Sequence, residues 1–266
     1  MGIIDFHTHP FLDNRYNICK HIPFCHPSAE DTVKALRGLG VVKICGSVIS
    51  PETTKADGSP YANEWERIRE WNDHALAVKE VYGDFYEVGF HIHPDFLAQS
   101  HAEIDKMAKL GVKIMGELVP YINGYTQYAT PQMHELVSHA TEKGMVVNIH
   151  TAPKADDDID AFVAQNPDAT IVAAHPGEYS TLLRHLARMQ RHEKYYLDLS
   201  GTGIFRLGML RRAIDEGDIH RILFGSDFPV CNPSAYVGAV TLDHLLSEEE
   251  KSLILCENAK RLLGLE

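Results

Sequence analysis

Apolar and polar positions follow a repeating two-part pattern along this chain. Short continuous apolar runs, rich in β-branched residues, are each followed by a longer amphipathic segment with apolar residues at helical spacing. A continuous apolar run is typical of a strand buried on both faces, as in a parallel sheet. The pattern predicts strands at 2–6, 41–49, 85–92, 112–118, 145–149, 170–174, 195–199 and 221–224.

The segments between these runs carry the start and stop signals of helices. Ser28 is a predicted N-cap with Asp31 three residues later, and Gly38 ends that segment. Ser247 and Glu250 have the spacing of a capping box. The predicted helices cover 28–38, 63–82, 99–110, 131–143, 155–165, 179–190, 207–216, 233–245 and 247–263.

Eight strands that alternate with helices predict a parallel α/β fold. The chain has 266 residues, which fits a single (β/α)8 TIM barrel of about 250 residues. The rival is a doubly wound sheet with a GxGxxG turn, but the glycine-rich stretch at 201–203 is too short and follows the seventh strand. Because no linker-like stretch marks a boundary, we expect one metal-dependent hydrolase domain over 1–266.

Charge and composition narrow the choice of partners. Lys and Arg number 25 against 37 Asp and Glu, a net charge of −12, which argues against nucleic acid or an anionic membrane as partner. No apolar run approaches the roughly 20 residues of a membrane span. The first predicted strand leaves no room for a signal peptide, and the five cysteines form no disulfide framework, so we expect a cytoplasmic protein. The sequence does not decide whether the chain forms a homo-oligomer.

Side chains that bind metals stand at the ends of five predicted strands. They are His7, His9, Glu117, His150, His175 and Asp227. Each alone has an ordinary structural explanation, such as a turn residue or a buried ion pair. In a barrel, however, the carboxyl ends of the strands form one rim, and residues two apart share a face. Four imidazoles and two carboxylates at one rim predict a divalent metal site, most naturally for Zn²⁺, with Mn²⁺, Fe²⁺ or Ni²⁺ open.

The order of these motifs resembles the amidohydrolase superfamily. The segments VNIH at 147–150, AHPG at 174–177, GSDFP at 225–229 and NAKRLLG at 258–264 are similar to its amidohydrolase-related (amidohydrolase 2) branch. The resemblance spans residues 3–265 and implies a metal-dependent barrel enzyme, usually a hydrolase.

Glu117 leaves two metal stoichiometries open. Many members of this branch have one metal and no ligand on the fourth strand, whereas TatD-like nucleases and related binuclear members carry a Glu there. If Glu117 bridges two ions, His150 and His175 hold the second one. If it does not, one ion is held by His7, His9, His150 and Asp227, and His175 is free for substrate.

A mechanism follows from the predicted ligands. A divalent ion lowers the pKa of its bound water from 15.7 toward about 7, which supplies hydroxide at neutral pH. We expect Asp227 to act as the general base, and the metal or His175 to polarise the scissile carbonyl. The predicted reaction is hydrolysis of an amide, ester or lactone of a small molecule. The residues expected to contact substrate are His21, His93, Tyr121 and Arg206.

Three other functions compete with this hypothesis. The first is a metal-dependent nonoxidative decarboxylase of the same branch, acting on a carboxylated aromatic or muconate-like acid; the short chain and Glu117 favour the hydrolase. Phosphodiester cleavage is suggested by Gly116-Glu117, but the acidic charge argues against polynucleotides. A non-catalytic ligand-binding barrel would have no need for a metal and a base together.

Overall fold

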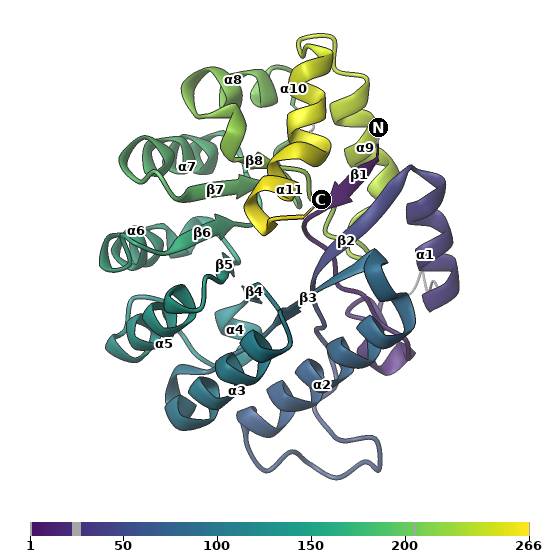
Figure 1. The fold of residues 1–266 in the computed structure, drawn as a ribbon, viewed down its shortest axis with the longest axis vertical. Helices are drawn as coiled ribbons and strands as arrows, with labels where there is room; N and C mark the ends of the chain where they lie inside the picture. Colours follow the sequence, from purple (N-terminus) through teal and green to yellow (C-terminus); the bar gives the residue numbers. More distant parts are fainter. Residues whose placement is uncertain (1, 23–27, 205, 266) are drawn as a thin grey trace.

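The strands form the predicted barrel. The computed structural model describes residues 2–22, 28–204 and 206–265. Within them lies one eight-stranded sheet whose strands pair in parallel and in sequence order, which confirms the (β/α)8 TIM barrel (Figure 1). The strands are β1 (Ile3–Asp5), β2 (Val41–Ser47), β3 (Tyr86–Phe90), β4 (Ile114–Leu118), β5 (Val146–Ile149), β6 (Thr170–Ala173), β7 (Tyr195–Asp198) and β8 (Ile222–Leu223).

Backbone contacts join the first strand to the last. The Phe6 N–H donates to the Phe224 carbonyl at 2.8 Å, and Thr8 forms a parallel bridge with Phe228. The segments after β1 and β8 are therefore neighbours, although more than two hundred residues separate them. This closure brings the two ends of the sheet to one rim.

Helices lie mainly on the outer side of the sheet (Figure 1). They are α1 (Ala29–Gly38), α2 (Glu64–Tyr82), α3 (Leu97–Lys109), α4 (Pro120–Asn123), α5 (Pro131–Glu142), α6 (Asp156–Gln165), α7 (Tyr179–Arg191), α8 (Met209–Glu216), α9 (Pro233–Thr241), α10 (Glu248–Ser252) and α11 (Asn258–Leu263). The Ser28 side chain accepts the Asp31 N–H at 3.1 Å, and Ser247 and Glu250 form the reciprocal capping box, as predicted. The predicted helix at 247–263 is divided by a π-helical turn, Leu253–Glu257.

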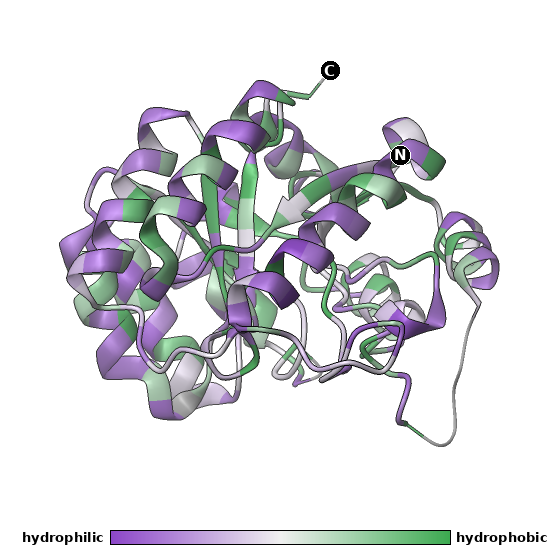
Figure 2. Cartoon of the chain, turned by 90° about the horizontal axis from the view of Figure 1, so that it is seen from below, coloured by the Kyte–Doolittle hydropathy of each residue, from purple (hydrophilic) through white to green (hydrophobic). Residues whose placement is uncertain are grey.

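Apolar side chains fill one end of the barrel interior. Ile4, Ile114, Val146 and Val172 come from four strands and form one buried cluster with Leu263 of α11. Strands on different sides of the barrel share this cluster, so it fills the barrel interior, and α11 covers that end. Figure 2 shows hydrophobic residues along the strands and hydrophilic residues on the outer turns of the helices. The predicted ligands at the carboxyl ends of the strands lie at the opposite end of the barrel, where His7, His9 and Glu117 are also buried.

One further property concerns the helices. Among the residues described, no helix is both long enough and apolar enough to cross a lipid bilayer.

Candidate metal centre

The six side chains predicted as ligands meet at the carboxyl ends of the strands. The atoms able to bind a metal form two groups, His7 with His9 and Glu117, and Glu117 with His150 and His175. Within each group these atoms lie within 4.8 Å of one another. The Asp227 Oδ1 atom lies 3.3 Å from His9 Nε2 and 3.7 Å from His7 Nε2, so it extends the first group. Glu117 belongs to both groups.

Glu117 directs one carboxylate oxygen at each group. Its Oε2 atom lies 3.4 Å from His7 Nε2 and 3.6 Å from His9 Nε2. Its Oε1 atom lies 2.9 Å from His150 Nδ1 and 3.4 Å from His175 Nε2. Tetrahedral zinc with bonds of about 2.0–2.1 Å places its ligand atoms about 3.3 Å apart. The spacing therefore fits two ions that share one carboxylate.

Hydrogen bonds fix which ring nitrogen of the first two histidines faces the centre. His7 Nδ1 lies 2.9 Å from Asp198 Oδ2, and His9 Nδ1 lies 3.0 Å from the Ser47 carbonyl oxygen. Both partners are acceptors, so each Nδ1 carries the proton and each Nε2 presents a lone pair. His7 Nε2 is buried and has no hydrogen-bond partner among the described residues, as expected of an atom that a metal completes.

Asp198 also acts on His175, through Ser200. The Ser200 hydroxyl donates its single proton to Asp198 Oδ1. It must then accept from His175 Nδ1, which lies 3.0 Å away, and this leaves the His175 Nε2 lone pair facing Glu117. One buried carboxylate thus orients a histidine of each group.

Neither Asp198 nor Ser200 was predicted from the sequence. Asp198 is the last residue of β7. It therefore shares the strand-end position that revealed the ligands, and this position is the signal that could have found it.

The charges at the centre favour a cation. Burial raises the pKa of Glu117, but His7 and His150 outweigh it and hold this pKa well below its usual value. Burial lowers the pKa of His7, yet Asp198 and Glu117 together raise it well above 6.5. Likewise the pKa of His175 is raised, because Glu117 outweighs burial. Without a metal, protons are therefore drawn to the place where a cation would lie.

One of the residues predicted to contact substrate lies beside the cluster. The Tyr121 side chain is 70% exposed, and its hydroxyl oxygen lies 3.4 Å from His150 Nε2. His150 thus has one ring nitrogen toward Glu117 and the other toward Tyr121. A cavity of about 600 Å³ opens next to these two residues.

The other three predicted substrate residues lie outside the ligand cluster. His93 is buried, and its Nδ1 atom accepts the Asp95 N–H at 3.1 Å. Arg206 is exposed and pairs with Glu178 at 2.7 Å. His21 is exposed in the loop that precedes the undescribed residues 23–27. Their contact with substrate remains a prediction.

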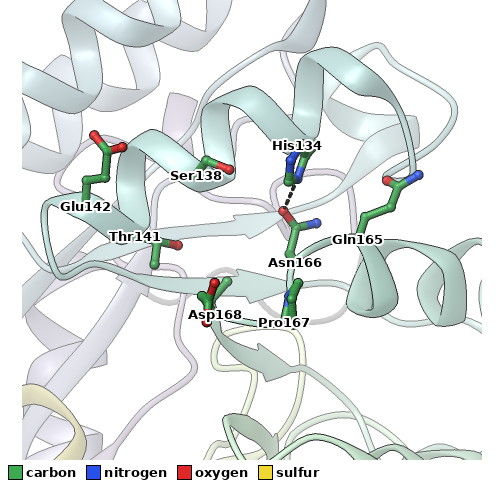
Figure 3. A pocket seen from close by; sticks show the side chains of 9 residues that line it. His134, Ser138, Thr141, Glu142, Gln165, Asn166, Pro167 and Asp168 are labelled. Carbon is green, nitrogen blue, oxygen red and sulfur yellow. Dashed lines mark hydrogen bonds between the residues drawn. The ribbon is translucent and has the colours of Figure 1, made fainter.

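A second hollow, of about 290 Å³, lies on the outside of the barrel (Figure 3). It is lined by α5 and by the segment that follows α6, where His134 Nδ1 lies 2.9 Å from Asn166 Oδ1. None of the residues predicted for the functional site lines it.

Comparison with known proteins agrees with this architecture. A family model described as amidohydrolase matches residues 4–265. No curated protein matches the chain. The solved structure of 2,6-dihydroxybenzoate decarboxylase from Rhizobium is 14% identical over 99% of both chains, with a TM-score of 0.75.

Two further solved structures have the same fold. Dihydroxybenzoic acid decarboxylase from Polaromonas sp., with bound manganese, is 15% identical over 99% of this chain and 97% of that one, with a TM-score of 0.74. A candidate 2-pyrone-4,6-dicarboxylic acid hydrolase from Pseudomonas putida is 20% identical over 100% of this chain and 98% of that one, with a TM-score of 0.71. At such identities the likeness concerns the fold.

Proposed function

Since this chain belongs to the amidohydrolase family, whose members are metal-dependent enzymes, we propose that it is a hydrolase of small molecules. The bond attacked is the carbonyl of an amide, ester or lactone, and the nucleophile is a water activated by metal. One observation carries this proposal: the two oxygens of the buried Glu117 face two separate groups of imidazole nitrogens. We take residues 1–266 as one catalytic domain, acting in the cytoplasm.

The proposed centre would hold two divalent ions. His7, His9, Asp227 and Glu117 would hold the first, and His150, His175 and Glu117 the second. Imidazole with carboxylate suits Zn²⁺ best, although Mn²⁺, Fe²⁺ and Ni²⁺ accept the same ligands. When bound, such ions lower the pKa of a coordinated water toward about 7 and polarise a carbonyl oxygen.

The protein's own groups then position and move the protons. Asp227 is placed to accept a proton from the attacking water and to return it to the leaving group, because its Oδ1 atom lies at the edge of the first ligand group. Asp198 and Ser200 hold His7 and His175 in their ligand tautomers. In this arrangement His175 would serve as a ligand rather than as a group that polarises the carbonyl.

Metal counting tests the shared carboxylate. We expect the purified chain, saturated with Zn²⁺ and measured by mass spectrometry of the metal, to hold two ions. Glu117→Gln should hold fewer, whereas Glu135→Gln, a change at an exposed carboxylate that pairs with His101, should still hold two. One ion at saturation, together with normal loading of Glu117→Gln, contradicts the binuclear centre.

Asp227→Asn tests the base. Loss of a general base typically lowers turnover by about 10²- to 10⁴-fold. We expect a loss in this range with the metal content largely retained. Turnover equal to that of the unchanged chain would remove Asp227 from this role.

Nonoxidative decarboxylation is the second candidate function. It is favoured by the solved structures of the same fold, which include decarboxylases of dihydroxybenzoate and of 5-carboxyvanillate. The ligands other than Glu117 would serve either reaction. Incubation of the metal-loaded chain with 2,6-dihydroxybenzoate and with 2-pyrone-4,6-dicarboxylate separates the two: carbon dioxide release supports the lyase, and acid release by ring opening supports the hydrolase.

A further inference from the structure

A cavity of about 600 Å³ adjoins the proposed metal centre. It lies between α4 and the segment that leads into α6, and its walls include Tyr121, Tyr125 and Lys154. His150 also lines it, and the Nδ1 atom of this residue lies 2.9 Å from Glu117 Oε1. A molecule in the cavity would therefore lie next to the centre. The volume is within the range of about 300–1,000 Å³ that is typical of small-molecule sites.

Two polar side chains in the cavity wall already form hydrogen bonds within the protein. The Tyr128 hydroxyl donates to the Leu118 carbonyl oxygen at 2.6 Å. The two carboxylate oxygens of Asp158 accept the backbone N–H groups of Tyr128 at 2.7 Å and Ala129 at 3.0 Å. Tyr128 and Asp158 thus stabilise the loop between α4 and α5.

Tyr125 has an uncommitted hydroxyl. The residue is only 7% exposed, and its hydroxyl oxygen is buried without a hydrogen-bond partner among the residues described. An unsatisfied buried hydroxyl costs about 1–3 kcal/mol, so its retention here calls for an explanation. Burial raises the pKa of this phenol, which therefore stays a neutral donor. Its ring is held edge-on by His93, with 5.5 Å between the ring centroids.

The ammonium group of Lys154 is available to a ligand. It lies in the 3-10 turn Pro153–Ala155, just before α6, and its side chain is exposed. It forms no ion pair with any carboxylate in the described part of the chain. Neighbouring acidic residues are engaged elsewhere: Asp156 pairs with Arg188, and Asp157 with Arg184, each at 2.7 Å.

We propose that this cavity is a specificity subsite in which Lys154 binds an anionic end group of the substrate, and in which the covered Tyr125 hydroxyl turns outward to donate to the same group. An ammonium and a neutral phenol both donate, and a carboxylate accepts from both. The body of the substrate lies against the exposed ring of Tyr121, which places its reacting group at the metal centre. This inference rests on the proposed function, since it takes the centre beside His150 to be the place of reaction.

Metal-chelating probes of defined length test the subsite. Benzohydroxamate supplies a chelating group, and its 3-carboxy and 4-carboxy derivatives add the anionic end group. We expect calorimetry on the Zn²⁺-loaded chain to show that at least one carboxy derivative binds about ten-fold more tightly than its neutral carboxamide, as fits a charge-assisted hydrogen bond. Lys154→Met and Tyr125→Phe should each reduce this preference to less than three-fold. Lys109→Met, a change at an exposed lysine of α3, should preserve it.

The outcomes separate the subsite from the centre. Tight binding of benzohydroxamate with no preference for a carboxylate overturns the subsite alone, as does a preference that survives both substitutions. Failure of every hydroxamate to bind, with no metal retained, overturns the metal centre and the subsite together. Metal content and thermal unfolding of each variant, measured in parallel, show that the preference is compared between folded, loaded proteins.

Discussion

Individual hydrogen bonds decide which ring nitrogen each histidine offers to the centre. His7 and His175 belong to different ligand groups, yet Asp198 orients both of them. It acts on His7 directly and on His175 through Ser200. Such outer partners matter because they fix the tautomer and increase the basicity of the ligand nitrogen. Asp198 should therefore influence metal affinity without touching the metal.

Substitution of Asp198 tests this role. Asp198→Asn keeps the size of the side chain but presents an amide where an acceptor of full charge is needed. Loss of an outer partner typically costs about 10- to 100-fold in metal affinity, and we expect a Zn²⁺ affinity lower by this factor in chelator competition. Asp215→Asn is the matched control, because Asp215 pairs only with Arg211 on the surface of α8 among the described residues. Equal affinities of the two variants would contradict the role.

A histidine that is not among the predicted ligands, His74, predicts a pH effect on stability. His74 stacks on Tyr16 with 3.7 Å between the ring centroids, and its Nε2 atom accepts the Leu12 N–H at 3.2 Å. Burial lowers the pKa of His74 to about 4, against the weaker opposite effects of Asp13 and Glu70. The folded ring therefore stays neutral while the unfolded ring, with a pKa near 6.5, takes up a proton.

The sign of this effect follows from the lowered pKa. The contribution of the neutral ring is present above pH 6.5 and is lost as the pH falls from 6.5 toward 4. Between pH 7 and pH 5 the loss is about 1 kcal/mol, allowing for solvent screening of a partly exposed ring. Urea unfolding should show wild type losing this amount relative to His74→Phe, which keeps the stacking. A gap between the two proteins that does not change with pH would refute it.

At the residue scale, the sequence predicted the side chains that come together as ligands. It did not predict the groups that orient those side chains through hydrogen bonds. The six predicted ligands were visible because the carboxyl ends of parallel strands converge, whatever the details of packing. Ser47 holds His9 through a backbone carbonyl, which has no side-chain signature. Tyr125 is of interest because its buried hydroxyl has no hydrogen-bond partner among the described residues, and only a folded structure can show this.

Secondary-structure elements place the ligands through close contacts between the segments that follow the strands. Gly201 follows β7 with φ +69°, and a Cβ atom there would lie 2.4 Å from His175 Nδ1. Gly208 has a similar φ of +84°, but a Cβ atom there would meet nothing within 4 Å. The two positions thus share their backbone strain and differ in their contact with the centre.

This pair of glycines gives a controlled prediction. Alanine in the left-handed region costs about 1–2 kcal/mol at either position, so both variants should unfold at somewhat lower temperature. Only Gly201→Ala should also displace His175 from Ser200, and we expect at least about a ten-fold loss of Zn²⁺ affinity, as for other lost outer contacts. Chelator competition measures this loss. Equal affinity of the two alanine variants would show that His175 tolerates the added methyl group.

The sequence predicted the strands and most helices well because each carries its own local signal. All eight strands appear, and α2 begins at Glu64, one residue after the predicted start. The predicted ends of helices and strands differ from the observed ends where tertiary contacts determine them. The helix predicted at 233–245 ends at Thr241, and the last strand shortens to Ile222–Leu223, where the chain leaves the sheet for the rim. The short helix α4, which borders the proposed subsite, has too few residues for any periodicity.

At the scale of the whole molecule, the proposed centre joins parts of the barrel that the sequence keeps far apart. Its ligands come from β4 and from the segments that follow β1, β5, β6 and β8. Backbone hydrogen bonds already join the first and last of these segments, because the Asp227 N–H donates to the His7 carbonyl at 2.8 Å. The barrel thus places its most distant segments at a single point.

A metal that binds this point binds only the folded chain, because the unfolded chain does not hold its ligands together. At a free concentration one hundred times its dissociation constant, such a ligand adds about 2.7 kcal/mol to the free energy of unfolding. For a chain of this size that corresponds to roughly 5–10 °C in the unfolding midpoint. We expect removal of metal with a chelator to lower the midpoint by this amount, and readdition of Zn²⁺ to restore it. Because Glu117 is proposed to serve both ions, Glu117→Gln should lose more than half of the shift, and a full shift in that variant would mean that the two groups of ligands act independently of their shared carboxylate.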